Sequence, residues 1–148
     1  MATIDDVRRL VSLDHGLAIL STLRRDGSVH NTVVNAGVID HPVTGRPVVA
    51  FVGRAGTLKL QHLHTTPSAT LCWRAGWAWC TAEGLAELAG PDDPLEGVAP
   101  AALPALLRMI YSAAGGGEHQ DWADYDRVMA AERRVAVLVT PRRIYVNP

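Results

Sequence analysis

The stretch GLAILSTLRRDGSVHNTVVNAGVI, residues 16–39, decides the fold that we expect of this chain. It begins with a short apolar run, Gly16 to Leu23, which is typical of a buried strand. Arg25 to Ser28 contains the Asp-Gly pair that favours a tight hairpin turn. Val29 to Ile39 then has the character of the returning strand, and its length suits a strand that wraps around a barrel. The stretch therefore predicts an antiparallel β-hairpin.

Further strand-like segments alternate with turn-forming residues along the chain. The expected strands are Val48 to Val52, Ala69 to Trp73, Trp77 to Ala89, Val135 to Thr140 and Arg143 to Val146. A glycine inside the longest of these, Gly84, indicates a β-bulge or a close approach of two backbones. About six strands in hairpin order predict a mainly β (α+β) protein built on an antiparallel barrel with short helices.

Helix-like segments interrupt the strands in four places. Thr3 is a suitable N-cap for the first helix, and Pro67 ends the second because the residue before a proline is disfavoured in the helical region. A hinge at Gly115 to Gly117 separates the last two. We find no repeat or linker that divides the chain, so we expect one domain over residues 1–148. The expected helices are Thr3 to Leu13, Thr57 to Leu63, Pro100 to Ala113 and Trp122 to Glu132.

The bulk composition is that of an ordinary globular protein, with 48% hydrophobic and 20% charged residues. The formal net charge of -1 gives no basic surface for nucleic acid. No apolar run approaches the ~20 residues that span a bilayer, and the first residues lack the apolar centre of a signal peptide. Cys72 and Cys80 have no metal-ligand spacing and are expected to be reduced. These features predict a cytoplasmic protein that binds neither nucleic acid nor membrane.

The segment Phe51 to Leu63 is the candidate anion site. A strand is expected to end at Val52, and a helix to begin near Thr57 after a glycine-containing turn. Backbone N–H groups at a helix start are unpaired and attract anions, and Arg54 and Lys59 add positive charge. The same pattern also fits an ordinary strand–turn–helix with solvated charges. Spacing alone leaves both interpretations open.

Lys59 is the one lysine among the 14 lysine and arginine residues of the chain. Chance in an arginine-rich sequence explains this as well as a need for a compact, flexible cation beside a phosphate. Trp77 and Trp79 are two residues apart on an expected strand and therefore project from the same face. They either pack at a core or subunit interface or form a wall for a planar ring system.

Motifs of metal sites and of common catalytic sites are missing from the sequence. His62 and His64 are two residues apart, so on a helix they face different directions and cannot bind one metal ion together. There is no nucleophile-elbow serine, no GxGxxG fingerprint and no Walker-type loop. We therefore predict no metal site and assign no catalytic residue.

Five stretches together resemble the split β-barrel superfamily related to pyridoxamine 5′-phosphate oxidase. The resemblance extends from residue 13 to 145 and is greatest to the actinobacterial coenzyme F-420-dependent oxidoreductases. It implies a six-stranded antiparallel split β-barrel that forms a homodimer with a cofactor site at the subunit interface. The stretches are STLRRDGSVHN (21–31), Thr57-Leu58-Lys59 with Leu63, GWAWCTAEGLAEL (76–88), GEHQDWADYDRVM (117–129), and RRV with IYVNP near the end.

The same resemblance implies roles for individual residues. Lys59 corresponds to the contact with the cofactor phosphate. Thr57 occupies a position that is often arginine in relatives, a loss for which Arg54 would compensate. Val33 and Asn35 lie on the strand beneath the tricyclic ring, and a second subunit contributes two tryptophans. The full set of expected cofactor contacts is Val33, Asn35, Val52, Arg54, Gly56, Thr57, Leu58, Lys59, Trp77 and Trp79.

The implied activity is transfer of a hydride from reduced coenzyme F-420, a deazaflavin, to an electron-poor small organic substrate. The cofactor would carry the chemistry, and the protein would supply orientation and proximity. Two alternatives stay open: an FMN-dependent oxidase or reductase, and a protein that binds flavin, deazaflavin or haem without turnover. The oligoglutamate tail of F-420 favours cations such as Arg24, Arg25 or Arg54 at its exit. His119 or Tyr125 in a lid, or solvent, would supply the proton.

Overall fold

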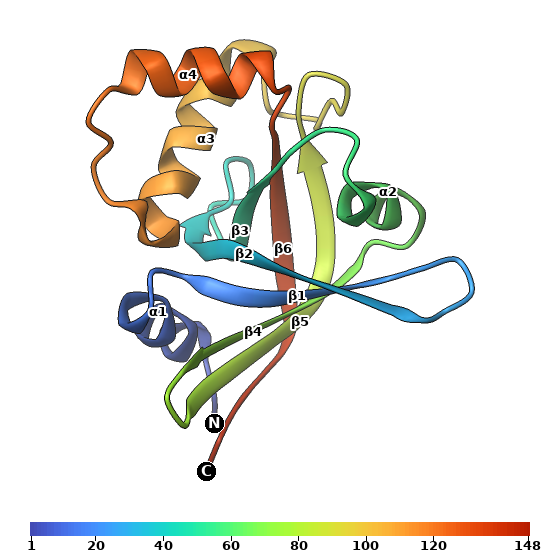
Figure 1. Ribbon diagram of the computed structural model, residues 1–148, viewed down its shortest axis with the longest axis vertical. Helices are drawn as coiled ribbons and strands as arrows, with labels where there is room; N and C mark the ends of the chain where they lie inside the picture. The colour runs from blue at the N-terminus through green and yellow to red at the C-terminus, as the bar shows by residue number, and fades with distance from the viewer.

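Six antiparallel strands close into a barrel in the order β1-β2-β3-β6-β5-β4 in the computed structural model, which describes residues 1–148 (Figure 1). The barrel closes because β1 pairs with both β2 and β4. The strands are β1 (Leu17–Leu23), β2 (Val29–Asp40), β3 (Pro47–Gly53), β4 (Ser68–Ala75), β5 (Ala78–Ala89) and β6 (Val135–Val146). The antiparallel barrel predicted from the sequence is confirmed.

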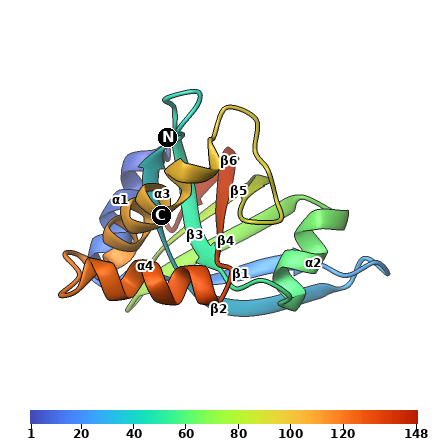
Figure 2. The same ribbon diagram turned by 90° about the horizontal axis from the view of Figure 1, so that it is seen from above.

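The β1–β2 hairpin forms where the Asp-Gly pair predicts it. Leu23 pairs with Val29, and Gly27 takes the left-handed conformation that the turn requires, with φ 84°. The Asp26 carboxylate accepts hydrogen bonds from the Ser28 hydroxyl and N–H, which lower the pKa of Asp26. The hairpin extends beyond the barrel in both views (Figures 1 and 2).

Two strand predictions are wrong in detail. The segments Val135 to Thr140 and Arg143 to Val146 form one continuous strand, β6, because Pro141 lies at an irregularity of the ladder instead of ending it. The register shifts between Glu83 and Gly84. A Cβ at Gly84 would lie 2.0 Å from the Thr140 carbonyl oxygen, so only glycine allows this approach. The predicted bulge and close backbone approach both occur there.

The other correction concerns Trp77, which precedes β5 instead of opening it. Trp77 and Gly76 form the turn between β4 and β5, and Gly76 has a positive φ of 60°. The Trp77 side chain is 92% exposed. Trp79 lies within β5 and packs edge-on against Tyr145 of β6, with ring centroids 6.1 Å apart.

Four α-helices surround the barrel: α1 (Ile4–Leu13), α2 (Leu58–Thr65), α3 (Leu103–Tyr111) and α4 (Trp122–Ala131). Thr3 and Asp6 form a capping box at the start of α1, as the sequence favours. The predicted helix Pro100 to Ala113 divides into a 3₁₀ turn (Pro100–Ala102), α3, and a π-helical turn, η2 (Ser112–Gly116). None of the helices has the length and apolar character needed to cross a membrane.

Apolar side chains pack in two layers on either side of the barrel wall. Inside, Phe51, Leu20 and Trp73 form the centre of the core, and α1 contributes Val7 and Leu10. Outside, α3 and α4 pack against the opposite faces of β3 and β6. Both faces of β3 are therefore covered, which explains its uninterrupted apolar sequence.

Close approaches at glycines fix η2 against β1 and β2. A Cβ at Gly37 would lie 2.2 Å from the Ala113 carbonyl oxygen, and one at Gly16 would lie 2.3 Å from that of Ala114. No real Cβ tolerates such distances, because neither backbone can move without shifting its strand or helix. The start of the segment that leads to α4 is thus anchored directly to the barrel.

Candidate functional site

A cleft of about 650 Å³ lies between the barrel and the α3–α4 pair. Its floor comes from β2 and β3, through Val33, Val34, Asn35 and Val52. Its walls come from the end of α3, from η2, and from α4. Figures 1 and 2 show α3 and α4 together on one side of the molecule, with α2 on another. The remaining lining residues are Lys59, Ile110, Tyr111, Ala114, Gly115, Gly116, His119, Asp124, Tyr125, Val128, Met129 and Arg134.

One end of the cleft carries positive charge. Lys59 lies in the first turn of α2, and Arg134 follows α4. Burial lowers the pKa of Lys59, and the charge of Arg134 lowers it further. The Arg134 guanidinium donates two hydrogen bonds to Glu132, at 3.1 and 2.9 Å, whereas Lys59 has no hydrogen bond or ion pair within the chain. Lys59 is therefore the uncompensated cation of this end.

The position of Lys59 follows from the packing of α2. Leu60 and Leu63 are buried in the barrel core, which fixes the rotation of the helix. Gly53 lets Leu60 approach the strand, since a Cβ there would lie 2.9 Å from a Leu60 methyl carbon. Gly56, with φ 81°, makes the turn that precedes the helix. Lys59 is thereby directed away from the core and into the cleft lining.

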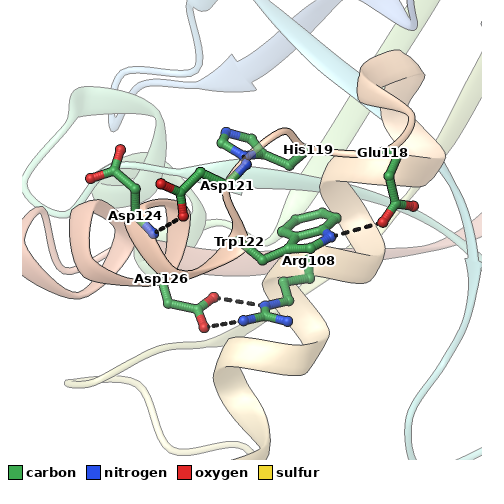
Figure 3. A network of polar contacts seen from close by, with 7 residues as sticks. All are labelled: Arg108, Glu118, His119, Asp121, Trp122, Asp124 and Asp126. Atoms are coloured by element: carbon green, nitrogen blue, oxygen red, sulfur yellow. Dashed lines mark hydrogen bonds and ion pairs between the residues drawn. The ribbon is translucent and has the colours of Figure 1, made fainter.

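The other end of the cleft is aromatic, and two of its residues, His119 and Trp122, are drawn in Figure 3. Tyr111 packs against His119, Trp122 and Tyr125 with ring centroids 5.3, 5.7 and 5.2 Å apart. Arg108 lies over the Trp122 ring at 5.2 Å and donates two hydrogen bonds to Asp126, at 2.9 and 2.5 Å. These contacts join α3 to α4 across the segment between them.

Several polar groups of this cluster are already hydrogen-bonded within the chain, which limits their use as proton donors to a ligand. The Tyr125 hydroxyl donates to the Leu107 carbonyl oxygen at 3.0 Å, and burial raises the pKa of Tyr125 to about 12. The Trp122 indole N–H donates to Glu118 at 3.1 Å. His119 Nδ1 accepts from the backbone N–H of Asp121 at 2.9 Å. Because its hydroxyl is already engaged, Tyr125 is poorly placed to serve a ligand.

The predicted cofactor contacts divide into three groups. Val33, Asn35, Val52 and Lys59 lie together in the cleft lining. The second group, namely Arg54, Gly56, Thr57 and Leu58, lies beside α2 but outside that lining, with the Arg54 Nε 3.9 Å from a Glu132 oxygen. The third group, Trp77 and Trp79, lines a separate groove with Leu17, Ile19 and Cys72. Val33 borders both the cleft and the groove.

Tyr111 and Arg134 are cleft residues that the sequence analysis missed. Both come to the cleft through the packing of α3 and α4 on the barrel, which no local spacing reveals. The RRV stretch that ends in Val135 is the only signal that bears on Arg134.

Comparison with known proteins identifies the fold. No protein-family model matches the chain. A conserved hypothetical protein from Mycobacterium tuberculosis superposes with a TM-score of 0.72 at 20% identity, over 99% of this chain and 84% of that one. A pyridoxamine 5′-phosphate oxidase-related, FMN-binding protein from Nostoc punctiforme gives 0.67 at 17% identity, over 96% and 79%. An F-420 reductase gives 0.61 at 14% identity, over 91% and 93%. The chain thus has the split β-barrel fold that its sequence motifs predict.

Proposed function

We propose that the cleft binds a flavin-type cofactor, with its anionic end at Lys59 and Arg134 and its ring system over β2 and β3. The observation that carries this proposal is a partly buried, unpaired lysine at one end of a cleft with an apolar floor. The volume of about 650 Å³ is typical of small-molecule sites. Solved structures of the same fold include a protein described as FMN-binding and one described as an F-420 reductase, which supports this class of ligand.

The start of α2 supports an anion at the same end. The Thr57 hydroxyl donates to the Arg54 carbonyl oxygen at 2.9 Å, so it does not cap the first turn of the helix. The N–H groups of that turn remain for a ligand or water, and they carry a partial positive charge. A phosphate placed there would accept charge-assisted hydrogen bonds from Lys59 and hydrogen bonds from the backbone. The Thr57 backbone N–H also donates to the Arg54 carbonyl oxygen, at 3.4 Å, so the N–H groups left for an anion are those of the first helical residues themselves.

Within this class we propose reduced coenzyme F-420, with hydride transfer to an electron-poor small organic substrate. Burial lowers the pKa of His30, and the charges of Arg24 and Lys59 lower it further, so both cations lie near His30. Arg25 adds a further positive charge at the exposed tip of the β1–β2 hairpin. The run of positive charge suits the oligoglutamate tail of a deazaflavin, whereas FMN ends at its phosphate. An FMN-dependent oxidase or reductase is the second candidate function, and binding without turnover is the third.

The side chains around the cleft would act on such a cofactor by binding and orientation. A bound deazaflavin supplies the hydride, while Val33, Val34 and Val52 offer a flat apolar support for its ring. The aromatic end would limit the access of water and hold the second reactant close to the ring, where proximity contributes most to the rate.

We also propose that a second copy of the chain covers the groove beside the cleft. Leu17, Ile19, Val33 and Trp77 expose 40, 49, 66 and 92% of their surfaces on this side. A contiguous apolar surface of this kind is typical of an interaction site, and a two-fold dimer buries the same patch on both copies. Because Val33 borders both the groove and the cleft, the partner would come to lie beside the cofactor.

Titration of the purified protein with F-420 and with FMN, followed by quenching of tryptophan fluorescence, tests the proposal. Tighter binding of F-420, together with loss of the reduced deazaflavin in the presence of an acceptor, is the expected result. Tighter binding of FMN would replace F-420 by the second candidate. Binding of either cofactor without turnover of any acceptor would favour the carrier. Failure of both cofactors to bind would overturn the assignment of the cleft.

A further inference from the structure

His119 enters the cleft lining with one ring nitrogen engaged and the other free. Its Nδ1 lies 2.9 Å from the backbone nitrogen of Asp121. A backbone N–H can only donate, so Nδ1 must be the acceptor and the proton of the neutral ring must be on Nε2. Nε2 makes no hydrogen bond within the chain and is not among its buried unpartnered atoms. The ring therefore offers one N–H donor to a ligand.

The neighbours of His119 hold this arrangement in place. Tyr111, Trp122 and Tyr125 surround the ring with centroids 5.3, 5.5 and 5.3 Å away. The polar groups of Trp122 and Tyr125 are already bonded to Glu118 and to the backbone of α3. His119 Nε2 and the Tyr111 hydroxyl are thus the two donors in this cluster that make no hydrogen bond within the chain, and both residues line the cleft.

Charge at this end of the cleft favours some substrates over others. Glu118, Asp121, Asp124 and Asp126 lie within one short segment, and Asp124 is part of the cleft lining (Figure 3). Arg108 pairs with Asp126 and Arg127 with Asp124, so Glu118 and Asp121 carry the negative charge that no cation compensates. The positive end at Arg134 lies beyond the far end of α4, about 15 Å away for ten residues at 1.5 Å each. An anionic substrate is therefore repelled from the end where His119 lies.

We propose that His119, as a neutral imidazole, donates a hydrogen bond from Nε2 to an uncharged acceptor oxygen of the substrate. The proposal rests on the function proposed above and narrows its substrate to an uncharged molecule in which that oxygen is conjugated to the carbon that is reduced. A cofactor bound in the cleft would supply a hydride for the new C–H bond and itself be oxidised, and the displaced π electron pair of the substrate would then lie on the oxygen that faces His119. The Nε2–H bond stabilises this developing negative charge, as donors in oxyanion holes do. The proton that completes the reduction comes from water, and His119 keeps its own.

Nuclear magnetic resonance of the histidine side chains tests the first step without any cofactor. Long-range ¹H–¹⁵N correlations at neutral pH should show His119 as the Nε2–H tautomer, assigned by loss of its signals in His119→Gln. An Nδ1–H tautomer or a doubly protonated ring would overturn the proposal. This readout does not depend on whether the cleft binds F-420, so it separates this inference from the proposed function.

Kinetics of two variants test the second step. His119→Phe keeps an aromatic ring and removes the donor, and we expect kcat to fall by about 100-fold, the effect of losing one oxyanion donor. His119→Gln restores a neutral N–H near the position of Nε2 and should recover most of that loss. Affinity for the cofactor should stay the same in both. Equal activity of His119→Phe and the wild type would refute the role, as would equal loss in both variants.

Discrimination between charged and uncharged substrates tests the substrate class. We expect an uncharged conjugated carbonyl compound to be reduced with at least 10-fold higher kcat/KM than its carboxylate analogue, about 1.4 kcal/mol. Glu118→Gln removes an uncompensated charge with little change in shape, and its amide oxygen can still accept the Trp122 indole hydrogen bond, so it should reduce this ratio. A wild-type preference for the carboxylate analogue would refute the assignment of an uncharged substrate.

Discussion

At the scale of single residues, Lys59 is the cation of the cleft that has no partner within the chain. Its ammonium group is partly desolvated, and the charge of Arg134 nearby further disfavours the charged form. An anion that binds between the two cations removes this unfavourable interaction and replaces lost water. In the proposed complex, Lys59 would therefore contribute to binding both by its own hydrogen bond and by relief of this repulsion.

Replacing Lys59 by alanine should weaken cofactor binding by about 1.5–3 kcal/mol, the range for a hydrogen bond to a charged group. Lys59→Arg should retain part of the affinity, because it keeps the charge in a different shape. Arg142→Ala is a matched control, since Arg142 is exposed and lies outside the cleft. Fluorescence titration measures the dissociation constants, and an unchanged value for Lys59→Ala would rule out the phosphate contact.

Replacing Gly37 by alanine should destabilise the fold by about 1–3 kcal/mol, the range for an overpacked site. The new Cβ would meet the Ala113 carbonyl oxygen at 2.2 Å, and neither backbone can give way easily. Gly53→Ala is the comparison, because the nearest atoms to its Cβ would be those of the Leu60 side chain, at 2.9 Å or more, and not a backbone oxygen. Urea denaturation measures both, and a loss at Gly37 no larger than that at Gly53 would contradict the rigid contact.

At the scale of secondary structure elements, the sequence predicts a feature well where neighbouring residues determine it, and poorly where contacts with distant strands determine it. The Asp-Gly turn and the Thr3 cap produce the expected hairpin and helix. Pro141 does not end a strand as expected, because Gly84 on the neighbouring strand accommodates the irregularity. Among the site residues, Lys59 follows from a local strand–turn–helix pattern. Tyr111 and Arg134 depend on how α3 and α4 dock, which the sequence does not encode locally.

The strength of the contact between α2 and the loop after β5 should depend on pH. His64 in the last turn of α2 lies 2.5 Å from an Asp93 oxygen, and this hydrogen bond raises the pKa of His64 above its ordinary value of 6.5. The pKa of His64 is therefore higher in the folded state than in the unfolded state. The stabilisation is fully present below the unfolded pKa and is lost as pH rises through the folded pKa.

Asp93→Asn should therefore destabilise the protein more at about pH 6 than at about pH 8.5, because the stabilisation is lost as pH rises through the folded-state pKa of His64. The effect is expected to be small, since the His64 side chain is half exposed. Asp92→Asn is the control, because Asp92 pairs with Arg133, which does not titrate in this range. Thermal unfolding at the two pH values measures the difference, and a loss for Asp93→Asn that is equal at both would contradict the assignment.

At the scale of the whole molecule, the apolar groove lies beside the cleft, so the proposed dimer would connect assembly to binding. Val33 borders the groove and the cleft, so a partner seated on the groove would influence the cofactor as well. Trp77, whose side chain is 92% exposed, lies in the turn between β4 and β5. Its position at a turn, not within a strand, lets it reach beyond its own subunit.

We expect the wild-type protein to sediment at twice the mass of one 15.9 kDa chain. Ile19→Glu should yield a monomer that binds the cofactor more weakly, because a buried, unpaired carboxylate at the interface is strongly unfavourable. Met109→Glu is the matched control, since Met109 is exposed to a similar extent on α3 and lies outside the groove. Analytical ultracentrifugation gives the masses, and a monomeric wild type would refute the interface.

The placement of α3 and α4 in the chain has an evolutionary consequence. Both helices belong to the connection between β5 and β6, two strands that pair directly with each other. The ladder that closes the barrel does not depend on what this connection contains, and connections between strands tolerate variation better than the strands do. Natural selection can therefore rebuild the wall that faces the substrate while the barrel and the Lys59 helix are inherited unchanged. One scaffold could in this way diversify into many substrate preferences.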